Sequence, residues 1–282
     1  MKSGSYFIPK EKIAGFMKNA AMNSQEGIFL YGLTDPKVKN LLPPPLELTD
    51  PAKPMFFVYI VNIREPTFAP WYMEGGIGLM AKYEDKAGLY FLNLQLSGPG
   101  ALMGAFSGRE GSGLPKKLCE RILVERVGDS AHCCIERKGV RLIDVELEIG
   151  KYNSPNFHLE AEACMTQKEP LVTGGGCLLH MYRMGKDSFT DMELFFYDSP
   201  MRYYTWEPAS AKVELRSSID DPWADVPVVE VLGAGWSKCD NWVNGLTPLY
   251  KFTDSEALDT MQYLFSGRYD RCTLSQSHQH YE

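Results

Sequence analysis

Two adjacent lysines, Lys116 and Lys117, stand between leucines directly after a proline. Pro115 favours extended geometry in the residue before it, and alternate side chains of an extended segment face opposite ways. Leu114, Lys116 and Leu118 therefore share one face, which we expect to be apolar, and Lys117 points to the other. A lysine on an apolar face loses solvation, and this loss favours the neutral amine, which is the nucleophile that forms an imine with a ketone.

The same pair also fits a solvated turn, which is the more common setting of adjacent lysines. Keeping a lysine neutral near pH 7 costs on the order of 4–5 kcal/mol. A fold is expected to tolerate that cost only where a reaction needs the neutral amine. Alternation alone therefore favours Lys116 as a nucleophile without excluding the solvated turn.

The lysine pair lies in a longer motif that resembles the signature of the acetoacetate decarboxylase family: Gly108-Arg109-Glu110, then Pro115-Lys116-Lys117-Leu118. The resemblance extends from about residue 28 to about residue 252. It includes further segments that are similar to the family in order and in composition: Leu42–Leu48, Trp71–Gly75, Trp206–Pro208, Val213–Leu215 and Pro227–Val231. Because several separate segments agree, the resemblance to the family rests on much of the chain and not on the lysine motif alone.

The resemblance implies that Lys116 forms a Schiff base with a keto acid and that Lys117 helps to keep its amine neutral, a kind of activation known for this family. Glu74, in the segment that begins at Trp71, matches a family glutamate. It would act as a general acid and base or orient the substrate. The alternative for Glu74 is a solvated carboxylate before a turn at Gly75-Gly76.

Two positions depart from the family pattern. Tyr59 takes the place of a second glutamate on the strand before Glu74, and Ser24 falls where the family has an arginine suited to a substrate carboxylate. No arginine occurs before Arg64. These losses weaken the expectation that acetoacetate is the substrate. Tyr59 becomes a candidate acid, base or hydrogen-bond donor in substrate binding, although a strand tyrosine also fits the core.

Four weaker candidates complete the expected site. Ser112 lies four residues before Lys116 and could donate a hydrogen bond to a bound substrate. Arg109 is a further candidate for substrate binding, although an ion pair with Glu110 that holds the loop is the favoured role. Tyr250 and Arg183 are candidates to line the pocket from later strands.

Strand signals dominate the sequence after the first fifty residues, without a regular alternation of strands and helices. We expect strands rich in β-branched and aromatic residues at 56–63, 89–96, 122–127, 140–149, 178–183, 192–197, 212–216 and 226–232. Helices are expected at 10–20, 36–42, 100–106 and 254–265, and Gly174-Gly175-Gly176 is expected to be a loop between strands. This pattern predicts an α+β fold with mainly antiparallel strands in a single domain, residues 1–282. The resemblance implies a cone-like β-barrel with flanking helices that assembles as a homo-oligomer.

Composition excludes several other classes of protein. The chain has 282 residues, 44% of them hydrophobic, and a net charge of −7, so it repels phosphate backbones and no nucleic-acid partner is expected. No apolar stretch has the length of a signal peptide or approaches the ~18 residues of a membrane span, so we expect a cytoplasmic protein without membrane contact. The seven cysteines form no C-x-x-C pair and the five histidines are scattered. We therefore expect free thiols, no metal site and no organic cofactor.

Three functions are left open by the sequence. The leading one is decarboxylation of a β-keto acid, in which the protonated imine on Lys116 accepts the electrons of the departing carbon dioxide. The second is aldolase or dehydratase chemistry on a pyruvate-like keto acid, favoured by Tyr59 and by the missing arginine. The third is a barrel that binds a small apolar ligand without turnover, in which Lys116 is dispensable.

Overall fold

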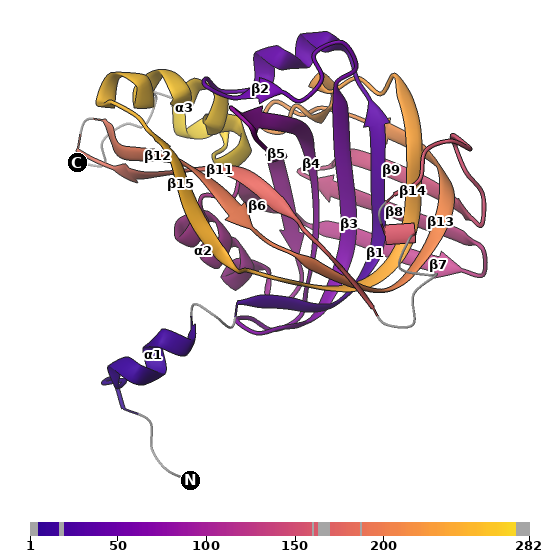
Figure 1. The fold of residues 1–282 in the computed structure, drawn as a ribbon, viewed down its shortest axis with the longest axis horizontal. Helices are drawn as coiled ribbons and strands as arrows, with labels where there is room; N and C mark the ends of the chain where they lie inside the picture. Colours follow the sequence, from indigo (N-terminus) through magenta and orange to yellow (C-terminus); the bar gives the residue numbers. More distant parts are fainter. Residues whose placement is uncertain (1–4, 17–19, 160, 163–169, 187, 275–282) are drawn as a thin grey trace.

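The computed structural model of the chain describes residues 5–16, 20–159, 161–162, 170–186 and 188–274. A 15-stranded sheet makes up most of the fold, and its strands pair antiparallel except where β6 and β11 run parallel to β5. The sheet curls round an interior (Figure 1). The strands are Ala21–Leu33 (β1), Glu47–Leu48 (β2), Met55–Pro66 (β3), Tyr72–Tyr83 (β4), Lys86–Ser97 (β5), Lys116–Leu118 (β6), Arg121–Val127 (β7), Ser130–Arg137 (β8), Val140–Ile149 (β9), Leu171–Thr173 (β10), Gly176–Met184 (β11), Phe189–Asp198 (β12), Met201–Leu215 (β13), Glu230–Trp242 (β14) and Gly245–Lys251 (β15).

The order of strands in this sheet is β15-β12-β11-β5-β4-β3-β1-β14-β13-β9-β8-β7. β2, β6 and β10 pair with β4, β5 and β13 respectively, beside this path. The path ends at β15 and β7, so the barrel is not closed by strand pairing among the described residues. The expected class, an α+β fold with a mainly antiparallel barrel-like sheet and flanking helices, is confirmed.

Three α-helices accompany the sheet: Lys10–Phe16 (α1), Ala101–Ser112 (α2) and Asp254–Arg268 (α3). α3 begins with a capping box, in which Thr253 and Glu256 exchange side-chain-to-backbone hydrogen bonds. α2 ends at Gly113, whose φ of 74° is in the left-handed region that glycine adopts most readily. Short 3₁₀ segments lie at Pro36–Leu41 (η1), Trp223–Asp225 (η3) and Arg271–Leu274 (η4). No described helix is long and apolar enough to cross a membrane.

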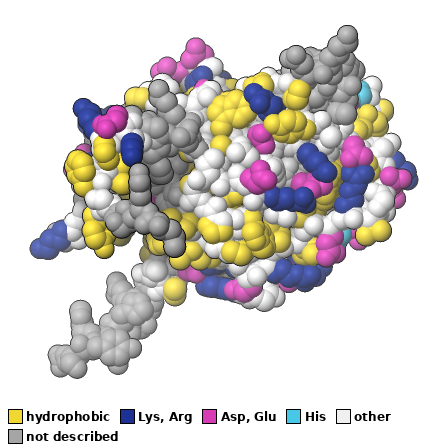
Figure 2. Space-filling model, turned by 90° about the horizontal axis from the view of Figure 1, so that it is seen from below, with side chains coloured by type: hydrophobic (Ala, Val, Ile, Leu, Met, Phe, Trp, Pro, Cys, Tyr) yellow, Lys and Arg dark blue, Asp and Glu magenta, His cyan; other side chains and the backbone are white. Residues whose placement is uncertain are grey.

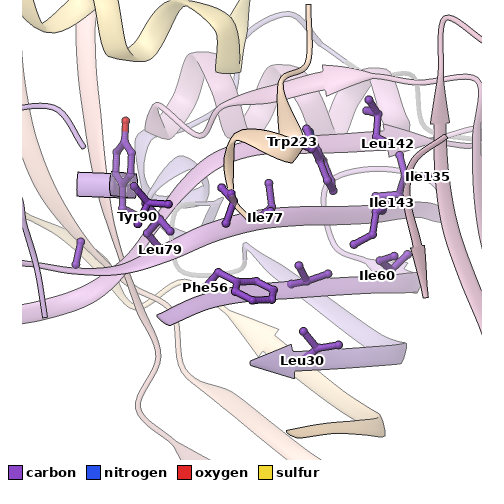
Figure 3. Packing of buried hydrophobic residues seen from close by; sticks show 14 of the residues in the cluster. Leu30, Phe56, Ile60, Ile77, Leu79, Tyr90, Ile135, Leu142, Ile143 and Trp223 are labelled. Atoms are coloured by element: carbon purple, nitrogen blue, oxygen red, sulfur yellow. The ribbon is translucent and has the colours of Figure 1, made fainter. Parts of the chain in front are cut away.

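Strand alternation divides the buried side chains into two groups. Along β3, Phe56, Val58 and Ile60 belong to the larger core, whereas Tyr59 and Val61 face the other way into a second cluster. Figure 3 shows the larger core, in which β3 packs with side chains from several other elements: Leu30, Ile77, Leu79, Tyr90, Ile135, Leu142, Ile143 and Trp223. Burial of each such side chain contributes about 2 kcal/mol. The larger core thus holds the sheet rigid behind the second, more aromatic cluster.

The structure corrects the predicted elements at two places that bear on function. The segment at Glu74 does not lead into a glycine turn, because Gly75 and Gly76 lie inside β4 and pair with β3 and β5. A Cβ on Gly76 would lie 2.1 Å from Leu94 Cδ2, so a glycine is needed here for close packing. The strand expected at 226–232 is wrong in its first half, since β14 begins only at Glu230, after η3 and a proline that lacks the N–H group of a strand.

Several strands were not predicted, among them strands that carry residues of the interior. β1 and β4 contain glycines and polar residues that weaken the alternating pattern, so tertiary pairing determines them. The remaining predicted strands and the helices at 36–42, 100–106 and 254–265 are confirmed, with α2 and α3 longer than expected. α1 is confirmed to Phe16, and residues 17–19 of the expected helix lie outside the described residues.

His180 in β11 is fully buried and is expected to make the fold sensitive to acid. Its ring packs against Tyr90 and Phe252, and neither ring nitrogen has a hydrogen-bond partner among the described residues. Burial, and next the charge of Arg268, lower the pKa of His180 to about 3, below its unfolded value of about 6.5. The histidine therefore contributes full stability above pH 6.5, and this contribution is lost as the pH falls from about 6.5 towards 3, by roughly 5 kcal/mol in all.

Replacing His180 by phenylalanine is expected to flatten the dependence of unfolding free energy on pH between 6.5 and 4. Urea unfolding followed at several pH values measures this slope. His158→Gln is the comparison, because it removes an exposed histidine that lies 2.8 Å from Glu162 and so separates the effect of burial from that of a surface contact. A slope that His180→Phe does not alter would show that another group determines the acid sensitivity.

Candidate active site

The curled sheet encloses a cavity of about 1120 Å³ beside the second, aromatic cluster. Its wall comes from strands that are distant in sequence, mainly β1, β3, β5, β12 and β13. The lining side chains are largely aromatic and include Phe29, Phe57, Tyr59, Phe91, Tyr197, Tyr203 and Trp206. Among the described residues that line the cavity no arginine occurs. A space of this kind suits an apolar molecule larger than acetoacetate.

Lys116 reaches this cavity from β6. The strand pairs in parallel with β5, which places Lys116 opposite Leu94. The Lys116 side chain is 5% exposed, and its Nζ lies 2.6 Å from Oε2 of Glu74, which is 9% exposed. Glu74 comes from β4, where it stands opposite Leu96 of β5. Lys116 and Glu74 thus form a buried charge-assisted pair on the wall of the cavity.

Tyr59 joins the pair from β3. Its hydroxyl group donates a short hydrogen bond to Oε1 of Glu74, so the carboxylate lies between a phenol and an amine. Burial, and next the nearby Glu74 carboxylate, raise the pKa of Tyr59 well above its usual value. The phenol therefore keeps its proton at physiological pH and acts as a donor. Lys116, Glu74 and Tyr59 form a connected group, which we call the triad.

α2 forms part of the cavity wall and contacts the triad through a glycine. A Cβ on Gly108 would lie 2.6 Å from Cε and 2.9 Å from Nζ of Lys116. The helix can therefore pack directly on the lysine side chain only because residue 108 has none. This contact explains why the motif places Gly108 eight residues before Lys116.

The family model for acetoacetate decarboxylase (ADC) matches residues 6–252. A relative from Lactiplantibacillus plantarum, named CLA biosynthesis isomerase, is 33% identical over 275 residues that cover 95% of each chain. This chain belongs to the acetoacetate decarboxylase family. The family's enzymes run more than one reaction, as the names of the relatives show.

Solved structures share the fold of this acetoacetate decarboxylase family member. Acetoacetate decarboxylase from Legionella pneumophila is 15% identical with a TM-score of 0.69, over 83% of this chain and 88% of that one. The enduracididine biosynthesis enzyme MppR, complexed with the condensation product of pyruvate and imidazole 4-carboxaldehyde, is 12% identical with a TM-score of 0.60, over 82% and 89% of the two chains. At these identities the likeness concerns the fold alone.

Lys117 faces away from the cavity, as the strand alternation predicted. Its Nζ donates to the carbonyl oxygen of Asp220 at 2.8 Å and lies 3.1 Å from Asp221 Oδ1 and 3.2 Å from Asp270 Oδ1. Arg137 binds the second oxygens of Asp221 and Asp270 at 2.6 and 2.8 Å. The charge of Lys117 is therefore balanced within a buried network on the opposite face of β6.

This geometry bears on the role that the family resemblance implied for Lys117. A cation that is paired with two carboxylates exerts little net repulsion on a neighbouring amine. Lys116 is thus surrounded by the apolar cavity and by Glu74. Lys117 holds β6 in place from the opposite face of the strand. We therefore expect Lys117 to contribute by positioning β6 and with it the Lys116 side chain.

Of the four weaker candidates, only Ser112 lies at the cavity. Ser112 lines the cavity, but its hydroxyl group already donates to the carbonyl oxygen of Gly108 at 3.1 Å. Arg109 forms the expected ion pair with Glu110 at 2.7 Å and lies outside the cavity lining. Its predicted contact with substrate is therefore not supported by its position.

Tyr250 and Arg183 also lie away from the triad. Tyr250 belongs to β15, which lies at the edge of the sheet. Its hydroxyl group donates a hydrogen bond to Glu256 at the start of α3. Arg183 is an exposed side chain 3.8 Å from Asp191. Ser24, which takes the place of the family arginine, donates hydrogen bonds to Asp240 and Glu65 outside the cavity.

Two lining residues near the triad were missed by sequence reasoning. Cys177 comes from β11 and Tyr197 from β12. Burial raises the pKa of both side chains, and nearby groups that include Glu74 add to the effect. The pKa of Cys177 rises to about 12. Both groups therefore stay protonated and neutral beside the triad. Their positions depend on long-range strand pairing, so no local signal could have found them. The described residues contain no cluster suited to a metal ion.

Replacing Gly108 by alanine is expected to displace the Lys116 amine and lower the rate of imine formation roughly 100-fold. The free energy of unfolding should change by no more than about 1 kcal/mol, because the lysine end can move and alanine favours a helix. Borohydride trapping with a ketone, read by mass spectrometry, measures the rate. Gly111→Ala on the same helix is the control, since a Cβ there meets nothing within 4 Å. Equal rates in the two variants would contradict the proposed contact.

Proposed function

We propose that this protein is an isomerase that moves a proton beside the carbonyl group of an apolar ketone, through an imine on Lys116. The observation that carries the proposal is the triad, in which one buried carboxylate contacts both the amine and a phenol whose pKa is raised by burial. Glu74 is thus placed to accept and return a proton next to the imine carbon. The relative at 33% identity, named an isomerase, supports the same class of reaction.

The proposed reaction begins when Lys116 gives a proton to Glu74, 2.6 Å away, and the neutral amine attacks the ketone; Glu74 then returns the proton to the departing hydroxyl group. Loss of water gives a protonated imine, which withdraws electrons from the neighbouring carbon. Glu74 takes a proton from that carbon, which gives an enamine conjugated with a double bond further along the substrate. Return of the proton to the far end of the double bond and hydrolysis of the imine release a conjugated ketone and the free amine. No atom is gained or lost, and no redox partner is required.

Decarboxylation fits the cavity less well. A β-keto acid would hold its own carboxylate close to the imine, within a few ångströms of Glu74. Two carboxylates 4 Å apart repel each other by about 4 kcal/mol at an effective dielectric constant of 20. The described lining offers no arginine to offset this repulsion, and its second lysine, Lys86, lies over the ring of Phe196. An apolar ketone avoids it.

Decarboxylation of a β-keto acid is nevertheless the second candidate, because the family model that matches most of the chain is that of acetoacetate decarboxylase. Both reactions use the same imine and differ only in the bond that breaks next to it. A substrate test therefore separates them more directly than a further comparison of sequences.

The test offers the purified protein a β,γ-unsaturated ketone of eight or more carbons and, separately, a series of β-keto acids. Ultraviolet absorbance follows the conjugated ketone, carbon dioxide release follows decarboxylation, and borohydride trapping follows the imine. Conjugation without carbon dioxide release is expected. Carbon dioxide release without conjugation would replace the isomerase by a decarboxylase. A trapped imine with neither product would favour aldol chemistry, and no imine with any ketone would favour simple binding.

A further inference from the structure

Arg268 is a buried cation that pairs with no carboxylate among the described residues. It is the last residue of α3 and is 4% exposed. Its Nη2 donates to the carbonyl oxygen of Gly113 at 2.5 Å and to that of His180 at 3.3 Å, and its Nη1 donates to that of Leu264 at 3.4 Å. Burial of a cation is unfavourable unless hydrogen bonds replace its solvation. The guanidinium group therefore depends on these carbonyl groups, and it holds them together in turn.

Arg109 makes the reciprocal contact from α2. Its Nη1 donates to the carbonyl oxygen of Arg268 at 3.3 Å and to that of Lys116 at 3.5 Å. The C-terminal ends of α2 and α3 thus meet beside the start of β6, and each helix provides an arginine for a carbonyl group at the end of the other. A helix carries partial negative charge at its C-terminus, so a cation is favourable there. We call this junction the arginine clamp.

The clamp fixes the short segment that leads into Lys116. It binds the carbonyl oxygens at both ends of residues 113–116, those of Gly113 and Lys116. α3 also packs closely on the middle of this segment, because a Cβ on Gly267 would lie 3.0 Å from Cβ of Pro115. The backbone that carries the Lys116 side chain is therefore held at both ends and from one side.

α2 is held only weakly by burial of its own side chains. The residues that it buries are all small: Ala101, Gly104, Ala105, Gly108 and Ser112. Its large apolar residues are between 48% and 53% exposed: Leu102, Met103 and Phe106. Seen from below, the molecule shows such hydrophobic side chains at its surface among charged ones (Figure 2). Because stabilisation by burial is proportional to the apolar area removed from water, the position of α2 depends strongly on the clamp at its C-terminal end.

We propose that Arg268 is a positioning residue for Lys116, which holds α2 and residues 113–116 so that the amine lies against Glu74 in the geometry that imine formation requires. Arg268 does not line the cavity, so it acts through other groups and does not touch the substrate. α3 begins at Asp254, after the family match ends at residue 252, so the clamp lies partly outside the family pattern. The inference rests on the imine of the proposed function and applies to every reaction that starts from it.

The test compares the full-length wild type with Arg268→Met and Arg268→Lys. Borohydride trapping with 2-octanone measures the rate of imine formation. Quenching of tryptophan fluorescence by 2-octanol, which cannot form an imine, measures binding, since Trp206 lines the cavity. Arg268→Met is expected to slow imine formation roughly 100-fold, the effect of a displacement of about 1 Å, with unchanged affinity for 2-octanol. Arg268→Lys keeps a cation that can bind a carbonyl oxygen and should recover most of the rate.

Met261→Ala is the matched control for stability. Met261 is buried in the same helix, belongs to the larger core and does not line the cavity. This variant is expected to lower the thermal midpoint and to form the imine at the wild-type rate below that midpoint. An equal loss of rate in Met261→Ala and Arg268→Met would mean that general loosening slows the reaction, and it would overturn the inference. A wild-type rate in Arg268→Met would overturn it as well.

Arg109→Met examines the other half of the clamp and replaces Arg268→Met as the test if that variant does not fold. Glu110→Gln is its control, because it removes the ion pair with Arg109 and leaves the bonds to the carbonyl groups. Arg109→Met should slow imine formation, and Glu110→Gln should not. The loss in the double variant should be smaller than the product of the two single losses, since both arginines hold one junction. Losses that multiply would overturn the clamp.

Failure of this inference is distinct from failure of the proposed function. If the wild type forms no imine with any ketone, the proposed function and the role of Arg268 fail together. If the wild type forms the imine and neither arginine variant slows it, the proposed function stands and only the inference about Arg268 is wrong.

Discussion

Lys116→Met is expected to lose imine formation entirely and to lower turnover at least ~10³-fold, because no other described amine lies within the triad. Methionine has nearly the same length as lysine and is apolar, so it fills the same space without a charge. The measurement is the mass of the protein after borohydride reduction with a ketone, together with the rate of product formation. The variant should show no adduct and essentially no turnover.

Lys117→Met is the matched control for this prediction, since it makes the same change on the opposite face of β6. It removes a cation from a buried network that includes Asp221 and Asp270, and breaking such a network costs about 3 kcal/mol of stability. The adduct on Lys116 is nevertheless expected to form. If the pH at which the adduct forms shifts strongly in this variant, Lys117 acts on the amine directly and our account of its role is wrong.

Glu74→Gln is expected to lower turnover by 10²–10⁴-fold, the range that general acid–base catalysis usually contributes. The amide keeps the size of the carboxylate and can still contact Lys116 and Tyr59, but it cannot take up a proton. Proton exchange at the carbon beside the ketone, followed by NMR in ²H₂O, reports this step separately from imine formation. We expect the adduct to persist while the exchange almost stops.

Tyr59→Phe provides the comparison for Glu74→Gln. It removes a hydrogen bond to the carboxylate and leaves the carboxylate itself, so a loss of only about tenfold is expected, equivalent to the ~1.4 kcal/mol typical of one bond. A loss as large as that of Glu74→Gln would mean that the phenol transfers the proton. Full activity in Glu74→Gln would place the base elsewhere in the cavity.

The orientation of Lys116 could be predicted because it depends on local geometry. The alternation of Leu114, Lys116 and Leu118 is a property of one extended segment. It correctly separated Lys116 from Lys117, although Leu118 is 44% exposed and does not line the cavity with Leu114 and Lys116. Gly108 is close in sequence to the lysine and was part of the motif, although its contact with the Lys116 side chain was not foreseen. The class of fold followed from many strand-like segments with few helices.

The partners of these residues could not be predicted in the same way. Glu74 meets Lys116 because β4 and β6 both pair with β5, and Tyr59 meets Glu74 because β3 pairs with β4. A shift of one residue in any of these registers would turn a side chain to the other face of the sheet. The sequence suggested Tyr59 only as a departure from the family and placed Tyr250 in a pocket that it does not line.

The sequence by itself determined that Lys116 lies on an apolar face, that Lys117 faces away, and that the chain forms a mainly antiparallel sheet. The tertiary structure decided that a carboxylate and a phenol meet the lysine, that the cavity is large and aromatic, and that Lys117 is paired with Asp221 and Asp270. The physical reason is that alternation belongs to the backbone of a single strand. Register and the closing of a cavity depend on contacts between residues far apart in sequence, such as the pairing of Ala21 in β1 with Trp242 in β14.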